Sequence, residues 1–232
     1  DEDGAGAIEL LLRDDYGDGW NGAKLIVYRD GVLIRELEMD YSYDEQTLFL
    51  PYSEEAGYAF IWIKGEYDYE CGVTITLPGG EEPVYNRDDF DSLASGEILL
   101  KLNLADYALV EQALDEVPDN LEEYTFESAV ALYETVNSVN WYMGKSQQEA
   151  VDGYAAAIKA ALAALEPGDG TASGFIDIRN GDLYITSTGY RRGSQEDEIA
   201  YTGSYYLIGD TSQYKVLIES GSHEIIINGL NI

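Results

Sequence analysis

The sequence predicts a multidomain chain of α and β structure, in which an antiparallel β-sandwich is followed by a three-helix bundle and a β-helix-like block. Apolar residues alternate over residues 1–103, recur at intervals of three and four over residues 104–166, and alternate again in brief pairs over residues 167–232. Alternation indicates strands with one buried face, whereas the spacing of three and four indicates amphipathic helices. We therefore place domain boundaries after residues 103 and 166.

The first block contains short strands separated by turn formers. Alternating apolar residues predict a first strand that contains Ile8 and Leu12 and a second that contains Leu25 and Val27. Asp30-Gly31 between apolar segments is typical of a tight β-hairpin. Further strands are expected at residues 47–50, 58–63, 73–77 and 97–102. This arrangement fits a small sandwich of jelly-roll type.

The loop between the first two strands, residues 14–22, is rich in oxygen ligands. Asp14 and Asp18, with Gly19 directly after, resemble the first, fifth and sixth positions of an EF-hand calcium loop, and Asn21 adds another hard oxygen. Tyr16 occupies the position where a third ligand is expected. A second source of carboxylate is therefore needed.

The segment after the strand at residues 58–63 supplies that source, because Asp68 and Glu70 follow it closely. We expect Ca²⁺ to be held by these two carboxylates together with the oxygen atoms of the loop. The alternative is that Asp18-Gly19 and Asn21-Gly22 are turn formers with no metal.

Aromatic residues supply candidate binding groups in the same block. Trp20 and Trp62 could form a platform for a sugar, and the alternative is that both tryptophans belong to the core. Tyr67 and Tyr69 alternate with acidic residues, which predicts that their rings are exposed. Because tyrosine supplies contact area at low entropic cost, the pair favours a recognition surface.

The string Asp-Asp-Tyr-Gly-Asp-Gly-Trp-Asn-Gly at residues 14–22 resembles a motif that recurs in sandwich modules of large bacterial secreted proteins. The resemblance extends to a tryptophan strand followed by a glycine and an acidic residue, here Trp62, Gly65 and Glu70. It implies a non-catalytic module.

The middle block shows three amphipathic stripes. They contain Leu104 to Val117, Ala129 to Met143 and Val151 to Leu165, with breaks at residues 118–120 and 144–146. Ser146 and Glu149 have the spacing of a capping box at the start of the third helix. Short connections predict an up-down-up bundle.

The same block resembles the FIVAR module, a three-helix bundle repeated in surface and secreted proteins of Gram-positive bacteria. The matching residues are the start of the second helix at Tyr124-Thr125 with Ser128, and the alanine-rich third helix that begins near Val151-Asp152. The resemblance implies a spacer or binding module without catalytic residues.

The last block contains brief apolar pairs separated by turns. Pairs at residues 176–178, 206–208, 216–218, 225–227 and 230–232 recur at a nearly regular interval, which predicts the edges of parallel β-helix coils. The block resembles the first coils of right-handed β-helix regions in Gram-positive surface proteins, some of them described as carbohydrate-binding. An apolar strand at Ile232 leads us to expect further coils after it.

The charge balance restricts the partners. The chain has 45 acidic residues against 13 lysines and arginines, a formal net charge of −32. Nucleic-acid binding depends on basic residues that replace counterions, so nucleic acid and anionic membranes are excluded as partners. No apolar run approaches the roughly 20 residues that a membrane-spanning helix needs, so we expect no membrane insertion in this chain. The single cysteine, Cys71, cannot form an internal disulfide.

The inventory of reactive groups argues against an enzyme. His223 is the only histidine, and the sequence contains neither a Gly-x-Ser-x-Gly motif nor a phosphate-binding loop. We therefore expect a non-enzymatic binding or adhesion segment of an extracellular protein, on the cell surface or associated with the wall. The expected partner is a host glycan or glycoprotein, with immunoglobulin as a specific candidate. The alternative is a set of ancillary carbohydrate-binding and spacer modules of a large secreted carbohydrate-active enzyme.

Overall fold

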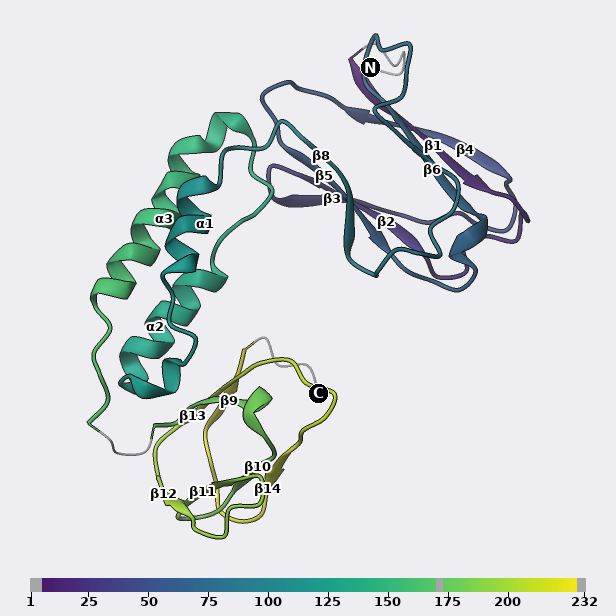
Figure 1. Cartoon of the computed structure of the whole chain (residues 1–232). Helices are drawn as coiled ribbons and strands as arrows, with labels where there is room; N and C mark the ends of the chain where they lie inside the picture. Colours follow the sequence, from purple (N-terminus) through teal and green to yellow (C-terminus); the bar gives the residue numbers. More distant parts are fainter. Residues whose placement is uncertain (1–5, 170–172, 229–232) are drawn as a thin grey trace. The chain divides into compact units, whose positions relative to one another are not determined.

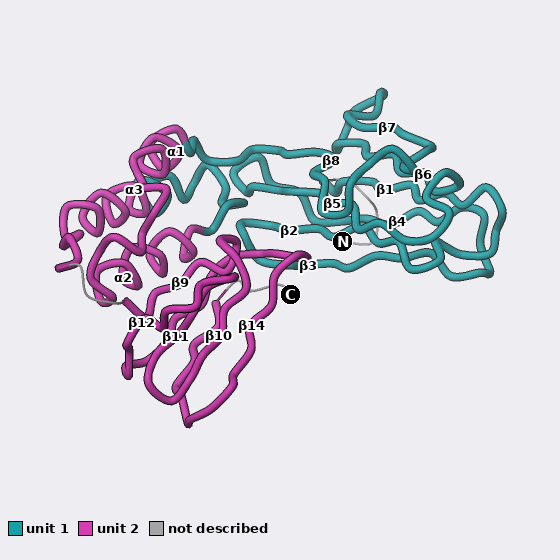
Figure 2. Tube along the Cα trace, turned by 60° about the horizontal axis from the view of Figure 1, so that its bottom comes forward, with its two compact units in different colours: residues 1–107, 140–152 teal, residues 108–139, 153–232 magenta. Residues whose placement is uncertain are grey.

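The computed structural model describes residues 6–169 and 173–228 (Figure 1). Its contacts divide the chain into two compact units, which are coloured separately in Figure 2. Unit 1 comprises residues 1–107 and 140–152, and unit 2 comprises residues 108–139 and 153–232.

Unit 1 contains two four-stranded antiparallel sheets, which Figure 1 shows face to face. The first has the order β4-β1-β6-β7, with β1 (Ala7–Asp14), β4 (Glu45–Pro51), β6 (Cys71–Thr76) and β7 (Tyr85–Arg87). The second has the order β3-β2-β5-β8, with β2 (Lys24–Arg29), β3 (Val32–Leu37), β5 (Tyr58–Ile63) and β8 (Glu97–Leu102).

The two sheets share one hydrophobic core, as expected of a β-sandwich. Ile8, Leu10 and Leu12 point inward from β1 and are fully buried. The apolar residues that alternate in the sequence are therefore those on the inner face of the pleated strand. The predicted strands all form, whereas the three-residue β7 was not predicted, because so short a strand gives no alternation to detect. The finer jelly-roll assignment stays a prediction.

The hairpin between β2 and β3 turns at Asp30-Gly31. Both residues have positive φ angles, 51° and 75°, as a two-residue type I′ turn requires. The Asp30 side chain also accepts a hydrogen bond from the Gly57 amide at 2.8 Å, which ties the turn to the start of β5.

Three helices follow: α1 (Ala108–Asp115), α2 (Phe126–Asn137) and α3 (Gln148–Ala163). Figure 1 draws them side by side. Among the described helices, none combines the length and the apolar character needed to cross a bilayer. The predicted three-helix bundle itself stays a prediction.

Two local expectations for the helices were wrong. The first helix starts at Ala108 rather than at Leu104, because Leu104 forms a β-bridge with Gly144 instead. The start of the third helix is stabilised by Gln147, whose side-chain oxygen accepts from the Gly144 amide at 3.1 Å, whereas the hydroxyl of Ser146 donates to the Glu55 carbonyl. A short 3₁₀ turn, residues 145–147, shifts the cap by two residues, from Ser146 to Gly144.

The connection between α2 and α3 packs in unit 1. The Ala105 amide donates to the Met143 carbonyl at 2.9 Å, and the Lys145 amide donates to the Asn103 carbonyl at 3.1 Å. The hydroxyl of Tyr107 donates to the carbonyl of Asn140 at 2.6 Å. Whether residues 104–166 fold on their own, between domains at 1–103 and 167–232, stays a prediction.

In the C-terminal part of unit 2, residues 173–228 form seven short strands in two sheets. The sheet β15-β13-β9 is parallel throughout, and in the sheet β12-β11-β10-β14 only the pair β10 and β14 is parallel. The bounds are β9 (Phe175–Asp177), β10 (Leu183–Ile185), β11 (Gly189–Arg192), β12 (Ile199–Ala200), β13 (Tyr205–Ile208), β14 (Val216–Ile218) and β15 (Ile225–Ile227).

The sides of these strands that face the interior form a second core, which includes Ile176, Leu183 and Leu207. The antiparallel excursion through β11 and β12 departs from the purely parallel coils that we predicted. The β-helix itself stays a prediction, and the expected strand at Leu230 and Ile232 lies outside the described residues.

Candidate functional site: a carboxylate cluster between β1 and β2

The loop after β1 and the segment before β6 lie next to each other because β1 and β6 are neighbours in one sheet. The register pairs Asp14 with Cys71, which places Asp14 beside the residue that precedes Cys71, Glu70. The Asp15 amide donates to the Glu70 carbonyl at 3.0 Å and continues this pairing into the loop.

The glycines of the loop permit its tight course. Gly19 has a φ of +90°, and a Cβ atom there would lie 3.0 Å from the carbonyl oxygen of Met39. Only glycine adopts this conformation without strain. The Gly19 amide consequently points at the Asp14 carboxylate and donates to it at 2.6 Å.

The structure brings three carboxylates together. Oxygen atoms of Asp14, Asp18 and Glu70 all lie within 4.8 Å of one another. Asp14 and Glu70 are buried, with 1% and 4% of their surface exposed, whereas Asp18 is open to solvent. None of the ion pairs found in the described part of the chain involves any of the three. Within the described residues, the negative charge at this point is therefore not neutralised by a direct ion pair.

Asn21 lies against the cluster with its amide nitrogen toward it, whereas we expected its side-chain oxygen to be a ligand. This nitrogen donates to the Asp18 carboxylate at 3.1 Å, to the Gly19 carbonyl at 2.8 Å and more weakly to Glu70 at 3.4 Å. In this orientation the side chain of Asn21 supplies hydrogen atoms to the carboxylates rather than an oxygen ligand.

The proximity of like charges affects the pKa of Glu70. Burial raises the pKa of the Glu70 carboxyl above its usual value, and the charges of Asp18 and Asp14 raise it further. The hydrogen bond from Asn21 offsets part of this effect. The ionised cluster is thus under electrostatic repulsion that a bound cation would relieve.

Asp68, which we expected as a ligand, does not join the cluster. Its side chain is buried, accepts from the Gly65 amide at 3.0 Å and lies 3.8 Å from the ammonium group of Lys64. It lies in the 3₁₀ turn of residues 68–70, which directs the two carboxylates of that segment to different neighbours.

Trp20 and Trp62 lie in the core of the sandwich, with 1% and 0% of their surface exposed. Their rings meet edge to face, with centroids 5.0 Å apart, and the indole nitrogen of Trp20 donates to the Arg13 carbonyl at 2.8 Å. Neither ring face is open to a sugar. Both tryptophans therefore belong to the core, which was the alternative to a sugar platform, since large flat side chains fill the space between two sheets.

Tyr67 and Tyr69 are exposed, at 53% and 50%, and their rings form an edge-to-face pair with centroids 6.2 Å apart. Tyr16, in the loop itself, is 75% exposed and was not predicted to be a binding residue. Desolvation raises the pKa of Tyr69, and the charges of Glu70 and Tyr16 add to the increase. Tyr16 belongs to the loop and Tyr69 directly precedes Glu70, so both are next to cluster residues in the chain. Its position within the acidic loop is the feature of the sequence from which Tyr16 could have been predicted as a binding residue.

An open cavity of about 580 Å³ also borders Asp14. Residues 13–15 form one wall, and residues 42–45, which include the exposed Tyr43, form the other. The backbone amide of Asp14 donates to the Asp44 carbonyl at 2.9 Å and holds the two walls together. An accessible space of the size of a small ligand therefore borders the segment that carries Asp14.

Comparisons with known proteins add little to this geometry. No protein-family model matches the sequence, and no curated protein matches it significantly. A solved structure of the CBM51-2 and INT domains of Clostridium perfringens ZmpB is similar at 15% identity and a TM-score of 0.25, over 73% of this chain and 34% of that chain. The same domains with CBM51-2 in complex with GlcNAc give 15% identity and a TM-score of 0.24, over 74% and 35%. The chain thus spans about a third of the length of these solved chains, and scores this low do not establish a common fold.

Proposed function

We propose that unit 1 is a non-enzymatic recognition module that binds a glycan at a site organised by a divalent cation, Ca²⁺. The observation that carries the proposal is the set of three carboxylates within 4.8 Å of one another, two of them buried and none paired with a basic side chain in the described residues. Three carboxylates are hard oxygen donors, the kind of ligand that Ca²⁺ takes in sets of six to eight. Backbone carbonyls, waters and ligand hydroxyls would fill the remaining positions.

The surroundings of the cluster support a sugar as the ligand. Tyr16, Tyr67 and Tyr69 present exposed rings near the carboxylates, and aromatic faces contact the apolar faces of sugar rings. Adjacent hydroxyl groups of the sugar would occupy open coordination positions of the cation. The site would then select a sugar by the spacing of its hydroxyls and by its apolar face.

We propose no catalytic step for the chain. Cys71 is buried in the core, and burial raises the pKa of its thiol, which disfavours the thiolate that acts as a nucleophile. The His223 ring lies 2.8 Å from the carbonyl of Ser220 and therefore contacts backbone.

We place this function outside the cell, on the surface or at the wall, with a glycan of a host glycoprotein as the partner class. Within that setting we propose the middle helices as a FIVAR-like bundle that acts as a spacer, supported by the buried stripe of Val110, Leu132 and Ile158. We propose the C-terminal strands as a short β-helix, supported by the parallel ladders of β9, β13 and β15 and of β10 and β14.

The experiment is a glycan array probed with the full chain, once with Ca²⁺ and once with a chelator, alongside immunoglobulin and mucin preparations before and after enzymatic deglycosylation. We expect signal on a restricted set of glycans with Ca²⁺, its loss with chelator and its loss after deglycosylation. Asp18→Asn should abolish the signal, whereas Asp91→Asn, an exposed aspartate outside the cluster, should retain it. Binding that persists on deglycosylated immunoglobulin would instead identify a protein partner.

The same preparation tests the alternative of an enzyme. Release of reducing sugar from a polysaccharide panel by the purified chain would contradict the non-enzymatic proposal.

A further inference from the structure

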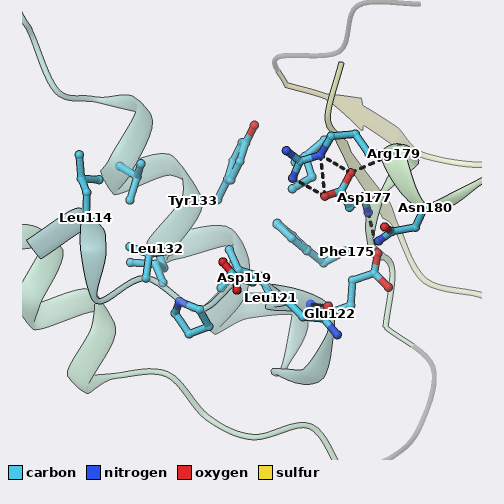
Figure 3. Close-up of a pocket in the computed structure, with 15 residues that line it drawn as sticks. Leu114, Asp119, Leu121, Glu122, Leu132, Tyr133, Phe175, Asp177, Arg179 and Asn180 are labelled. Atoms are coloured by element: carbon cyan, nitrogen blue, oxygen red, sulfur yellow. Dashed lines mark hydrogen bonds and ion pairs between the residues drawn. The ribbon is translucent and has the colours of Figure 1, made fainter. Parts of the chain in front are cut away.

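Unit 2 contains a groove of about 650 Å³ that the site in unit 1 does not involve. One wall is formed by the end of α1, the connection to α2 and the inner face of α2, and the other by β9 and the 3₁₀ turn after it (Figure 3). This volume accommodates several side chains.

The two walls differ in chemistry. The helical wall is aliphatic, and its partly exposed residues are Leu114, Val117 and Val136. The opposite wall is polar and contributes the Asp177–Arg179 pair and the amide of Asn180. Phe175 borders the groove but is only 1% exposed, because its ring packs against Tyr133 and Tyr206. An aliphatic wall and a covered ring suit an apolar side chain better than the face of a sugar.

The charges of the groove are paired except for one. The Arg179 guanidinium donates to both oxygens of Asp177, at 3.0 Å from its Nε, and Glu122 accepts from Arg192 at 2.5 Å and from the Asp177 amide at 2.8 Å. Asp119 lies beside the aliphatic wall, and within the described residues its carboxylate makes no hydrogen bond or ion pair (Figure 3). The groove therefore retains one uncompensated negative charge next to apolar surface.

We propose that this groove binds a peptide segment of a partner protein that places an apolar side chain against Leu114 and Val136 and a lysine or arginine at Asp119. A basic side chain is the complement of the one unpaired carboxylate. The amide of Asn180 offers both a donor and an acceptor, as a peptide backbone requires. The net charge of −32 adds long-range attraction for a basic partner.

The test uses an array of hexapeptides in which glycine flanks two variable central residues, probed with the full chain. We expect peptides with an apolar residue beside lysine or arginine to be selected over the same apolar residue beside glutamate or serine. The best peptide is then titrated in solution against Asp119→Asn, for which a roughly tenfold loss of affinity is expected from the loss of a close charge pair. Asp115→Asn, an exposed aspartate at the end of α1 that does not line the groove, should leave the affinity unchanged.

Val117→Trp provides a second variant, which fills the groove from a partly exposed position while circular dichroism verifies the helices. It should abolish binding of the selected peptides. Selection of peptides without a basic residue, equal affinity for Asp119→Asn, or displacement of the peptide by a neutral oligosaccharide would overturn the proposal. Addition of a chelator should have no effect on this binding, which separates its failure from failure of the cation site in unit 1.

Discussion

At the scale of single residues, the candidate cation site depends on which side chains the backbone brings to one point. Asp14, Asp18 and Glu70 come together because the β1 and β6 ladder places the loop beside the turn at residues 68–70. The sequence alone predicted this, since the spacing of the acidic loop and a second acidic segment were both visible. It did not predict the separate role of Asp68, because the 3₁₀ turn that directs its carboxylate to the Gly65 amide leaves no periodic pattern.

The first prediction concerns Glu70→Gln. In chelator this variant should melt at the same temperature as the wild type or higher, because the repulsion with Asp14 and Asp18 is removed. Added Ca²⁺ should stabilise the wild type by about 2.7 kcal/mol at a hundredfold excess over Kd, and its melting temperature should rise accordingly. The variant should gain clearly less. Thermal scans measure this difference, with Glu66→Gln, an exposed neighbour, as the control. If Glu70→Gln and Glu66→Gln both respond to Ca²⁺ like the wild type, the result counts against the site.

The second prediction concerns Tyr205 in the core of the C-terminal strands. Burial raises the pKa of its hydroxyl to about 12, and its hydroxyl donates to the Gly189 carbonyl at 3.2 Å. Since the folded pKa exceeds the unfolded value near 10, the related stability is present below pH 10 and is lost as pH rises through 12. Tyr205→Phe should therefore flatten the alkaline fall in urea stability over this range. An equally steep fall in the variant would show that other groups cause it.

At the scale of elements, most strands followed from alternation, and the Asp30-Gly31 turn followed from the needs of a hairpin. The sequence did not predict the direction in which strands pair or the exact length of strands and helices. The antiparallel strands β11 and β12 and the three-residue β7 depend on tertiary partners, and the late start of α1 depends on the bridge between Leu104 and Gly144. Local propensity does not encode such long-range contacts.

The third prediction concerns the ion pair within unit 2 that connects the 3₁₀ turn of residues 121–123 to strand β11. Glu122 accepts from Arg192, and the two side chains are only 24% and 16% exposed. Arg192→Met should lower the free energy of unfolding by about 1–3 kcal/mol, because a largely buried carboxylate loses its charged partner. Arg191→Met removes the more exposed pair with Glu219 and should cost less, about 0–1 kcal/mol. Urea denaturation of both variants checks the order, and equal losses would contradict it.

At the scale of the whole molecule, the contacts join the connection between α2 and α3 to unit 1. Two glycines make this approach possible: a Cβ at Gly57 would lie 2.8 Å from the Gly144 amide nitrogen and 2.9 Å from the Leu104 side chain. The sequence did not reveal this packing, since an isolated glycine indicates a turn as readily as a close contact.

The fourth prediction follows from that contact. Gly57→Ala should destabilise unit 1 by about 1–3 kcal/mol, because the added methyl group meets backbone that cannot move aside cheaply. Gly153→Ala, inside α3 with nothing within 4 Å of the new Cβ, should instead stabilise by about 0.5–1 kcal/mol through helix propensity. Chemical denaturation of the two variants measures both signs, and a neutral Gly57→Ala would show that the contact is not formed in solution.

The most direct test of the central claim is isothermal titration calorimetry of Ca²⁺ into the full chain. If Asp14, Asp18 and Glu70 form a cation site, the wild type should bind one ion at this cluster, and both Asp18→Asn and Glu70→Gln should lose that binding while Asp91→Asn retains it. If the wild type shows no saturable binding, or if the two cluster variants bind Ca²⁺ as the wild type does, the cluster is an arrangement of turn-forming acids and the proposed function is wrong.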